Sequence, residues 1–137
     1  MTSAEYLGNM ELLKLRKTGF IASRRMATTD VIPTLDWAME MSRQKDIAVV
    51  SGFQSPMEKD VLKFLLQGQC PIIIVLARGI YKRLPQNLCQ AMTQNRLLVV
   101  SIEKPNVTRV SEITAHRRNE YIKDIVDEIK LIVGRQN

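Results

Sequence analysis

Two long apolar runs constrain this chain more than any other feature of its sequence. Residues 71–76 read Pro-Ile-Ile-Ile-Val-Leu and residues 97–102 read Leu-Leu-Val-Val-Ser-Ile, and neither run alternates apolar with polar residues. Strands of this kind are buried on both faces, which is typical of parallel sheets covered by helices on either side. Both runs are far shorter than the ~20 residues that a membrane-spanning helix needs. The runs therefore predict interior strands of a parallel sheet.

The remaining sequence indicates a regular alternation of strands and helices. A strand at residues 18–22 is followed by a helical stripe of apolar residues over 28–43, and this alternation repeats along the chain. It predicts an α/β fold with a doubly wound, mainly parallel five-stranded sheet, right-handed crossovers and helices on both faces. We expect a single domain over residues 1–137, with an N-terminal helix in 1–16 and a core in 17–134. The predicted strands are 18–22, 47–50, 71–76, 97–102 and 131–133, and the other predicted helices are 56–67, 85–94 and 111–128.

Composition and charge exclude several functional classes. The 137 residues carry 20 basic and 14 acidic side chains, which gives a net charge of +6 and favours an anionic partner without naming one. No GxGxxG or GxxxxGK[ST] motif occurs, so a common dinucleotide site or P-loop is not predicted. With one histidine, His116, and two cysteines far apart in the sequence, we expect no metal, no cofactor and no catalytic set. We interpret His116 as a packing or hydrogen-bonding residue.

The sequence also gives expectations about the cell compartment. No apolar run is long enough for a membrane span, and residues 2–6 do not resemble the basic start of a secretory signal. Cys70 and Cys89 form no CxxC pair, and we interpret both as buried free thiols. We therefore expect a cytoplasmic protein without membrane contact.

Polar segments follow four of the predicted strands, and in a parallel sheet they lie at one edge. Doubly wound sheets bind ligands at this edge, outside the carboxyl ends of the strands. Arg24 and Arg25 come directly after the first strand, where a guanidinium can hold a phosphate through two hydrogen bonds, although a solvated surface arginine is the alternative. Phe53 lies in one of these loops and is a candidate to stack on a base. The other candidate ligand residues at this edge are Ser23, Ser51, Gly52, Arg78, Gly79, Lys82, Arg118 and Asn119.

The segment Ser-Gly-Phe-Gln-Ser-Pro-Met-Glu-Lys-Asp, residues 51–60, has two interpretations. Ser55 followed by Pro56 and Glu58 is a typical helix start, with a side-chain cap, proline in the first turn and a glutamate three residues after the cap. The same backbone N–H groups could instead hold a phosphate. Glu58 favours the plain cap, because a carboxylate in the first turn competes with a bound anion.

Five segments of the sequence, taken in order, form a recognisable set. They are Phe20-Ile21-Ala22-Ser23-Arg24, Val49-Val50-Ser51-Gly52, Ile74–Ile80 with Leu84-Pro85-Gln86-Asn87, Leu97–Pro105, and Arg117–Ile122. Together they resemble the Rossmann-type core of the DprA/Smf family of bacterial DNA-processing proteins, within the wider SLOG-like group of nucleotide-related domains. The corresponding family features, in the same order, are a Gly-Ser-Arg strand exit, a Ser-Gly strand exit, a Gly-Leu step with Pro-x-x-Asn, an acidic-proline strand exit and an Arg-Asn-Arg-x-Ile helix. The resemblance runs from about residue 17 to residue 133.

The resemblance implies a non-enzymatic protein that binds single-stranded DNA in a basic pocket at this edge, in natural transformation or recombination, and that helps to load the RecA recombinase. Carried over to this sequence, Arg24 becomes the leading phosphate contact. Arg78 and Lys82 fall in a loop where the family also places basic contacts. The residues implied to line the pocket are Ser23, Ser51, Gly52, Asn87 and Asn119.

Three departures from the family pattern affect this transfer. After Ser51-Gly52 the family has Ala-Arg-Gly-Ile-Asp, whereas this sequence has Phe53-Gln54-Ser55, so the arginine of that loop is absent. The first loop begins with Ala22 where the family has glycine. The family core also continues through further strands, and we expect the corresponding sheet edge to be covered by the N-terminal helix or by a partner in a homodimer.

Two other functions remain as alternatives. One is a sensor that binds a nucleotide-derived ligand and recruits proteins. The other is a LOG-like phosphoribohydrolase that cleaves nucleoside monophosphates, but the Pro-Gly-Gly-x-Gly-Thr segment of that family is missing, and Glu58 and Glu112 do not form a convincing acid pair.

Overall fold

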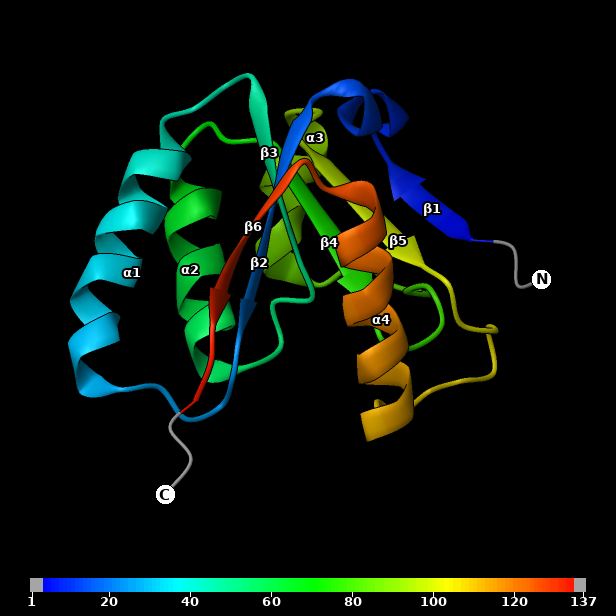
Figure 1. Ribbon diagram of the computed structural model, residues 1–137. Helices are drawn as coiled ribbons and strands as arrows, with labels where there is room; N and C mark the ends of the chain where they lie inside the picture. Colours follow the sequence, from blue (N-terminus) through cyan, green and yellow to red (C-terminus); the bar gives the residue numbers. More distant parts are fainter. Residues whose placement is uncertain (1–3, 135–137) are drawn as a thin grey trace.

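The computed structural model describes residues 4–134, which form a six-stranded sheet with helices on both faces (Figure 1). The strand order is β1-β5-β4-β3-β2-β6; β1 is antiparallel to β5, and all other pairs are parallel. The predicted doubly wound, mainly parallel α/β fold is confirmed, but the sheet has six strands where five were expected. The strands are β1 Glu5–Gly8, β2 Arg16–Ala22, β3 Ile47–Ser51, β4 Ile72–Leu76, β5 Leu97–Ser101 and β6 Glu128–Ile132, and the helices are the 3-10 turns η1 Met10–Lys14 and η2 Gln86–Leu88 with α1 Thr28–Ser42, α2 Pro56–Gln67, α3 Cys89–Thr93 and α4 Glu112–Ile125.

Alternate side chains of the buried strands build two cores, one on each face of the sheet. On one face, Val49, Ile72 and Ile74 pack against residues of α1, α2 and α3. On the other face, Val50 and Ile73 pack with Ile122 of α4. Figure 1 shows α1 and α2 on one side of the sheet and α4 on the other. Burial of both faces explains why β4 and β5 contain no alternating polar residues.

The order of the strands places a switch point beside β2. From β2 the chain adds β3, β4 and β5 in one direction, and it then crosses through α4 to add β6 on the other side of β2. Ligands of doubly wound sheets bind outside the carboxyl ends of the strands at such a point. The fold therefore directs attention to the ends of β2 and β6.

The expected N-terminal helix in residues 1–16 is wrong where the structure describes it. Residues 5–8 form β1, which pairs with the edge of β5 from Glu5 opposite Ser101 to Gly8 opposite Leu98, and residues 10–14 form η1. The apolar spacing had suggested a helix, but an uncovered β5 edge would leave its backbone groups unpaired. Pairing with a distant strand therefore outweighs the local pattern.

Two helix boundaries also differ from the prediction. The segment expected as one helix over 85–94 consists of η2 and the short α3. The last helix ends at Ile125 instead of residue 128, because Asp127 accepts a hydrogen bond from the backbone N–H of Lys17 at 2.7 Å and Glu128 already belongs to β6. None of the helices in the described part of the chain is long and apolar enough to cross a membrane.

Candidate functional site

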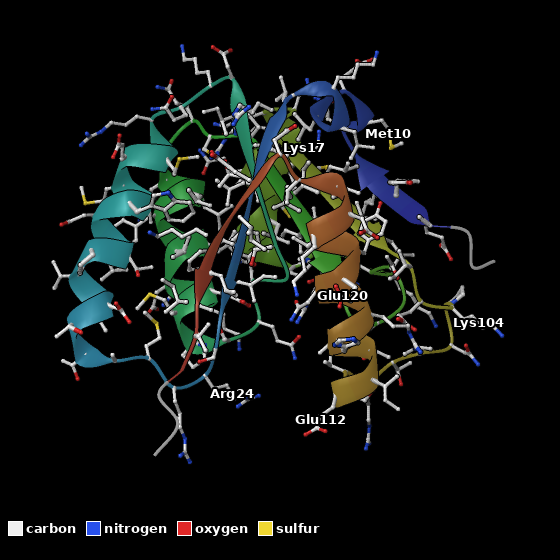
Figure 2. The ribbon with its side chains drawn as sticks, viewed as in Figure 1. Met10, Lys17, Arg24, Lys104, Glu112 and Glu120 are labelled. Carbon is white, nitrogen blue, oxygen red and sulfur yellow. The ribbon has the colours of Figure 1, made fainter. Side chains whose placement is uncertain are left out.

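A pocket of about 360 Å³ lies at the switch point, where β2 and β6 end. Ser23 and Arg24 line it from the loop after β2, Arg118 and Asn119 from α4, and Leu131 from β6. Arg24 is exposed, and Figure 2 shows it at the same end of the molecule as Glu112, opposite the end that carries Lys17. The strand order thus brings together four of the predicted ligand residues that are up to 96 positions apart in the sequence.

Arg118 is buried beneath this pocket and is 5% exposed. Its Nη1 donates to Oε1 of Gln54 at 3.0 Å, and its Nε donates to Oδ1 of Asn119 at 2.8 Å. The guanidinium lies directly against Gly52, where a Cβ atom would collide with it. Burial lowers the pKa of Arg118, while the nearby charge of Glu58 raises it. Arg118 therefore forms part of the pocket wall and needs a glycine at the exit of β3.

The helix start at Ser55 contains its own anion. The Ser55 side chain accepts from the backbone N–H of Glu58 at 3.4 Å, and the Glu58 carboxylate accepts from the backbone N–H groups of Ala22, Gln54 and Ser55 at 3.0, 2.9 and 3.1 Å. Glu58 is 4% exposed. The N–H groups of Ala22, Gln54 and Ser55 are thus not available to a phosphate, and the capping box at Ser55 and Glu58 confirms the interpretation as a helix cap. A ligand in this pocket must be held mainly by side chains.

Ser51 and Phe53 face the interior of the protein. Ser51 is fully buried, and its Oγ accepts from the backbone N–H of Phe53 at 3.1 Å. Phe53 adopts a positive φ of 49°, which turns its side chain into the core, where it is 6% exposed. This position gives Phe53 a role in packing and leaves little of its ring surface for a base to stack on.

Arg78, Gly79 and Lys82 belong to a separate part of the edge, above β4. The loop after β4 is joined to the loop after β5 by the Gly79 N–H, which donates to the carbonyl of Val107 at 2.8 Å, and to the end of β5 by Ser101 Oγ, which donates to the carbonyl of Arg78. The Arg78 guanidinium carbon lies 5.7 Å from the centre of the Tyr81 ring, and its Nε is buried without a hydrogen-bond partner among the described residues. Lys82 is exposed.

The remaining predicted residues are divided between the two regions. Asn87 is exposed and lines a second pocket, of about 270 Å³, together with Gly52 and Phe53. Arg25 is exposed and does not line the switch-point pocket; its carbonyl accepts from Ser23 Oγ at 2.8 Å. The predicted site is therefore an extended edge with two pockets instead of one continuous cavity.

The loops at the carboxyl ends of the strands carry most of the excess positive charge. Residues 23–27, 52–55, 77–85 and 102–111 contain seven basic residues and a single acidic one, Glu103. Glu103 is buried and accepts from Arg117 Nε and Nη2 at 3.0 and 2.7 Å, so its charge is compensated. At the opposite ends of the strands, residues 43–46, 68–71, 94–96 and 126–127 contain three basic and two acidic residues. The positive field is concentrated at the edge that carries both pockets.

Sequence reasoning missed some features of this region. It gave Gln54 no role, although Gln54 connects the loop after β3 to Arg118. Cys89 is exposed, in contrast to the expected buried thiol, and His116 is exposed on α4 with its Nε2 3.7 Å from Glu120, so it is not a packing residue. Within residues 4–134, no group of three or more histidine, cysteine, aspartate or glutamate side chains is placed to hold a metal ion.

A doubly wound, mainly parallel sheet with helices on both faces defines a Rossmann-like domain. Within that class, the family model described as DNA recombination-mediator protein A matches residues 5–136, and the chain belongs to this family. The resemblance to DprA seen in the sequence is therefore confirmed. No curated protein sequence matches the chain at a significant level.

Two solved structures have the same fold. DNA processing protein A from Streptococcus pneumoniae is 18% identical, with a TM-score of 0.73 over 98% of this chain and 47% of that chain. DNA processing protein A from Helicobacter pylori, described for its single-stranded DNA binding mode, is 19% identical, with a TM-score of 0.72 over 93% of this chain and 59% of that chain. This chain thus spans about half the length of these relatives.

Proposed function

We propose that this protein is a non-enzymatic domain that binds single-stranded DNA along the carboxyl-end edge of its sheet. The observation that carries the proposal is the switch-point pocket, with exposed Arg24 at its mouth, inside an edge whose loops carry seven basic residues and one compensated acid. Membership of the family and the DNA binding named for the Helicobacter pylori relative support it.

In this proposal, side chains and not a helix terminus hold the phosphate. Glu58 occupies the backbone N–H groups of Ala22, Gln54 and Ser55 beside the start of α2, and Arg24 provides the direct charge-assisted contact. Ser23 and Asn119 add neutral hydrogen-bonding groups, and buried Arg118 adds positive charge from below. Arg78 and Lys82 extend the positive field along the proposed path of the single-stranded DNA.

The experiment is a salt series with a labelled oligothymidylate, a duplex of the same length and thymidine monophosphate. We expect the single strand to bind most tightly and its affinity to fall steeply with salt, with a slope of about −0.7 per neutralised phosphate. Arg24→Ala should weaken binding about tenfold to hundredfold and make the slope shallower by about 0.7. Arg43→Ala, which removes an exposed arginine at the opposite end of the strands, is the matched control. Unchanged affinity in Arg24→Ala would reject the role of Arg24.

A nucleotide-binding sensor is the second candidate, and the size of the pocket favours it. A volume of about 360 Å³ falls within the range of roughly 300–1,000 Å³ that is usual for small-molecule sites. In the same assay, a sensor would bind the monophosphate tightly and show no further gain with longer strands. The hydrolase alternative has less support, because Glu58 is the single carboxylate among the described residues that line the pocket, and its oxygens already accept three backbone hydrogen bonds.

Two further proposals concern partners, the first from family resemblance and the second from the sheet edge at β6. The first is that the protein helps RecA to load on single-stranded DNA in the cytoplasm, which is tested by RecA filament formation with and without the protein.

The second is a homodimer that covers the edge strand β6, in which Leu131 is 51% exposed and Ile129 is 39% exposed. Light scattering over a concentration series measures this association.

A further inference from the structure

The second pocket, which we call the α2 pocket, has an apolar floor and a basic rim. It lies between α2 and the segment that follows β4, and its volume is about 270 Å³. The floor consists of Leu62, Ile74 and Leu88, which are 9%, 3% and 2% exposed. Its rim residues include Lys59, Lys63, Tyr81 and Asn87.

The composition of the α2 pocket specifies a flat, mostly apolar group next to a negative charge. Its volume is slightly below the usual range of small-molecule sites, so it has room for about one ring system. Lys59 and Lys63 are exposed and lie one helical turn apart on α2. Lys63 has a distant ion pair with Asp60 at 3.9 Å, and no carboxylate of residues 4–134 lies within ion-pair distance of Lys59. The ammonium groups of Lys59 and Lys63 can therefore form ion pairs with an anion bound at the rim of the pocket.

Tyr81 adds an aromatic surface. It is half-buried, and burial raises the pKa of its hydroxyl, so the group stays neutral and can donate a hydrogen bond. The Arg78 guanidinium lies 5.7 Å from the ring centre, which fixes a positive charge near the ring. Aromatic side chains held in this way are the usual stacking partners of unpaired bases.

The α2 pocket adjoins the switch-point pocket across a single residue. Gly52 lines the α2 pocket, and Arg118, which lines the switch-point pocket, lies against Gly52. One strand of nucleic acid held at the first pocket can therefore reach the second by passing over the Gly52 backbone.

We propose that the α2 pocket binds the base of a nucleotide, with Tyr81 and the apolar floor against the ring and Lys59 and Lys63 near the adjoining phosphate. The nucleotide can come from two sources: a unit of the single strand bound at the edge, or a free mononucleotide. The first source rests on the proposed function, whereas the second does not.

The test compares oligothymidylate with an abasic oligonucleotide of equal length, which has the same phosphates but no bases. Fluorescence anisotropy with the wild-type protein should show about tenfold tighter binding of the oligothymidylate. Tyr81→Ala should remove this difference and leave the affinity for the abasic strand unchanged. Asn87→Trp, which fills the pocket from an exposed rim position, should do the same if Tyr81→Ala does not fold. Tyr6→Ala, an exposed tyrosine on β1, is the matched control and should keep the tenfold difference.

The outcomes separate the two proposals. If neither oligonucleotide binds, the proposed function fails; the α2 pocket then stands only if thymidine monophosphate shifts the methyl NMR signals of Leu62, Ile74 and Leu88. If both strands bind equally well and the monophosphate leaves these signals unchanged, the α2 pocket is overturned while binding at the edge stands. A difference between the strands that persists in Asn87→Trp also overturns the proposal.

Discussion

At the scale of single residues, the tightest contact at the candidate site is that between the Arg118 guanidinium and Gly52. A guanidinium seated on a glycine keeps a positive charge beneath the switch-point pocket without filling it, and hydrogen bonds to Gln54 and Asn119 fix its orientation. The glycine is required here by the close approach of a side chain, because any Cβ would take the space of the guanidinium.

Gly52→Ala should therefore impair stability and binding together. The added methyl group must displace Arg118, which costs about 1–3 kcal/mol in the free energy of unfolding and also weakens binding of single-stranded DNA. Urea denaturation and anisotropy measure the two effects. Gln54→Ala is the control, because it removes one hydrogen bond to Arg118 without inserting an atom beneath it, and it should have the smaller effect. Equal effects of the two variants would show that the steric contact is not decisive.

Glu58 contributes to stability by acting as an internal anion. Its carboxylate joins β2 to the start of α2 through three backbone N–H groups, and one of these belongs to Ala22, 36 positions away. Glu58→Gln should lower the free energy of unfolding by about 2–3 kcal/mol, because hydrogen bonds to a charged acceptor are lost and one N–H faces an amide donor. Glu112→Gln changes an exposed glutamate in the first turn of α4 and should cost below about 1 kcal/mol.

At the scale of elements, α4 turns Ile113 and His116 to solvent and buries Thr114, Arg118 and Ile122. These three lie at intervals of four and form one stripe. The stripe is hard to recognise in the sequence because Arg118 lies in its middle. The burial of Arg118 depends on Gly52, Gln54 and Glu58, which belong to another part of the chain.

This orientation of α4 predicts opposite outcomes for two isoleucines of one helix. Ile122 is fully buried, and Ile122→Ala should lower the free energy of unfolding by about 2–5 kcal/mol. Ile113 is 67% exposed, and Ile113→Ala should change it by at most about 0.5 kcal/mol. Urea denaturation of both variants tests the orientation, and a larger loss for Ile113→Ala would contradict it.

At the scale of the whole molecule, the two cysteines differ in solvent exposure, and their reactivity therefore tests which parts of the chain are buried. Cys89 is exposed, whereas Cys70 is buried just before β4, and burial raises the pKa of the Cys70 thiol from 9.0 to about 12. A disulfide reagent at pH 8 should therefore modify one thiol per native chain rapidly, and Cys89→Ser should abolish this fast reaction. Loss of the fast reaction in Cys70→Ser instead would contradict the assignment.

The raised pKa of Cys70 also gives a pH dependence with a definite sign. Below about pH 9 the thiol is protonated in both the folded and the unfolded chain, and its contribution to stability is complete. Between about pH 9 and pH 12 the unfolded chain loses this proton before the folded chain does, so stability falls with rising pH. The stability difference between the wild type and Cys70→Ser should therefore shrink across this range, as measured by urea denaturation at each pH.

The sequence predicted those parts of the fold that depend on near neighbours. The apolar runs of β4 and β5 and the cap of α2 at Ser55 were read correctly, because solvent exclusion and capping act over a few consecutive residues. The sequence did not predict β1 or the division of residues 85–94 into η2 and α3. For β1 the reason is that this strand forms only by pairing with β5. For the candidate site, Ser23, Arg24, Arg118 and Asn119 do share one pocket, whereas Phe53 turns into the core at a positive φ that the residue type does not suggest.

The sequence by itself determined that strands and helices alternate, that the sheet is mainly parallel and covered on both faces, and that basic residues follow the strands. Only the tertiary structure decided which arginine is buried, which anion occupies the start of α2, and how the edge divides into two pockets. The physical reason is range: hydrophobic periodicity and helix capping are properties of short segments, whereas Arg118 on Gly52 and Glu58 on Ala22 are contacts between segments that meet only when the sheet has formed.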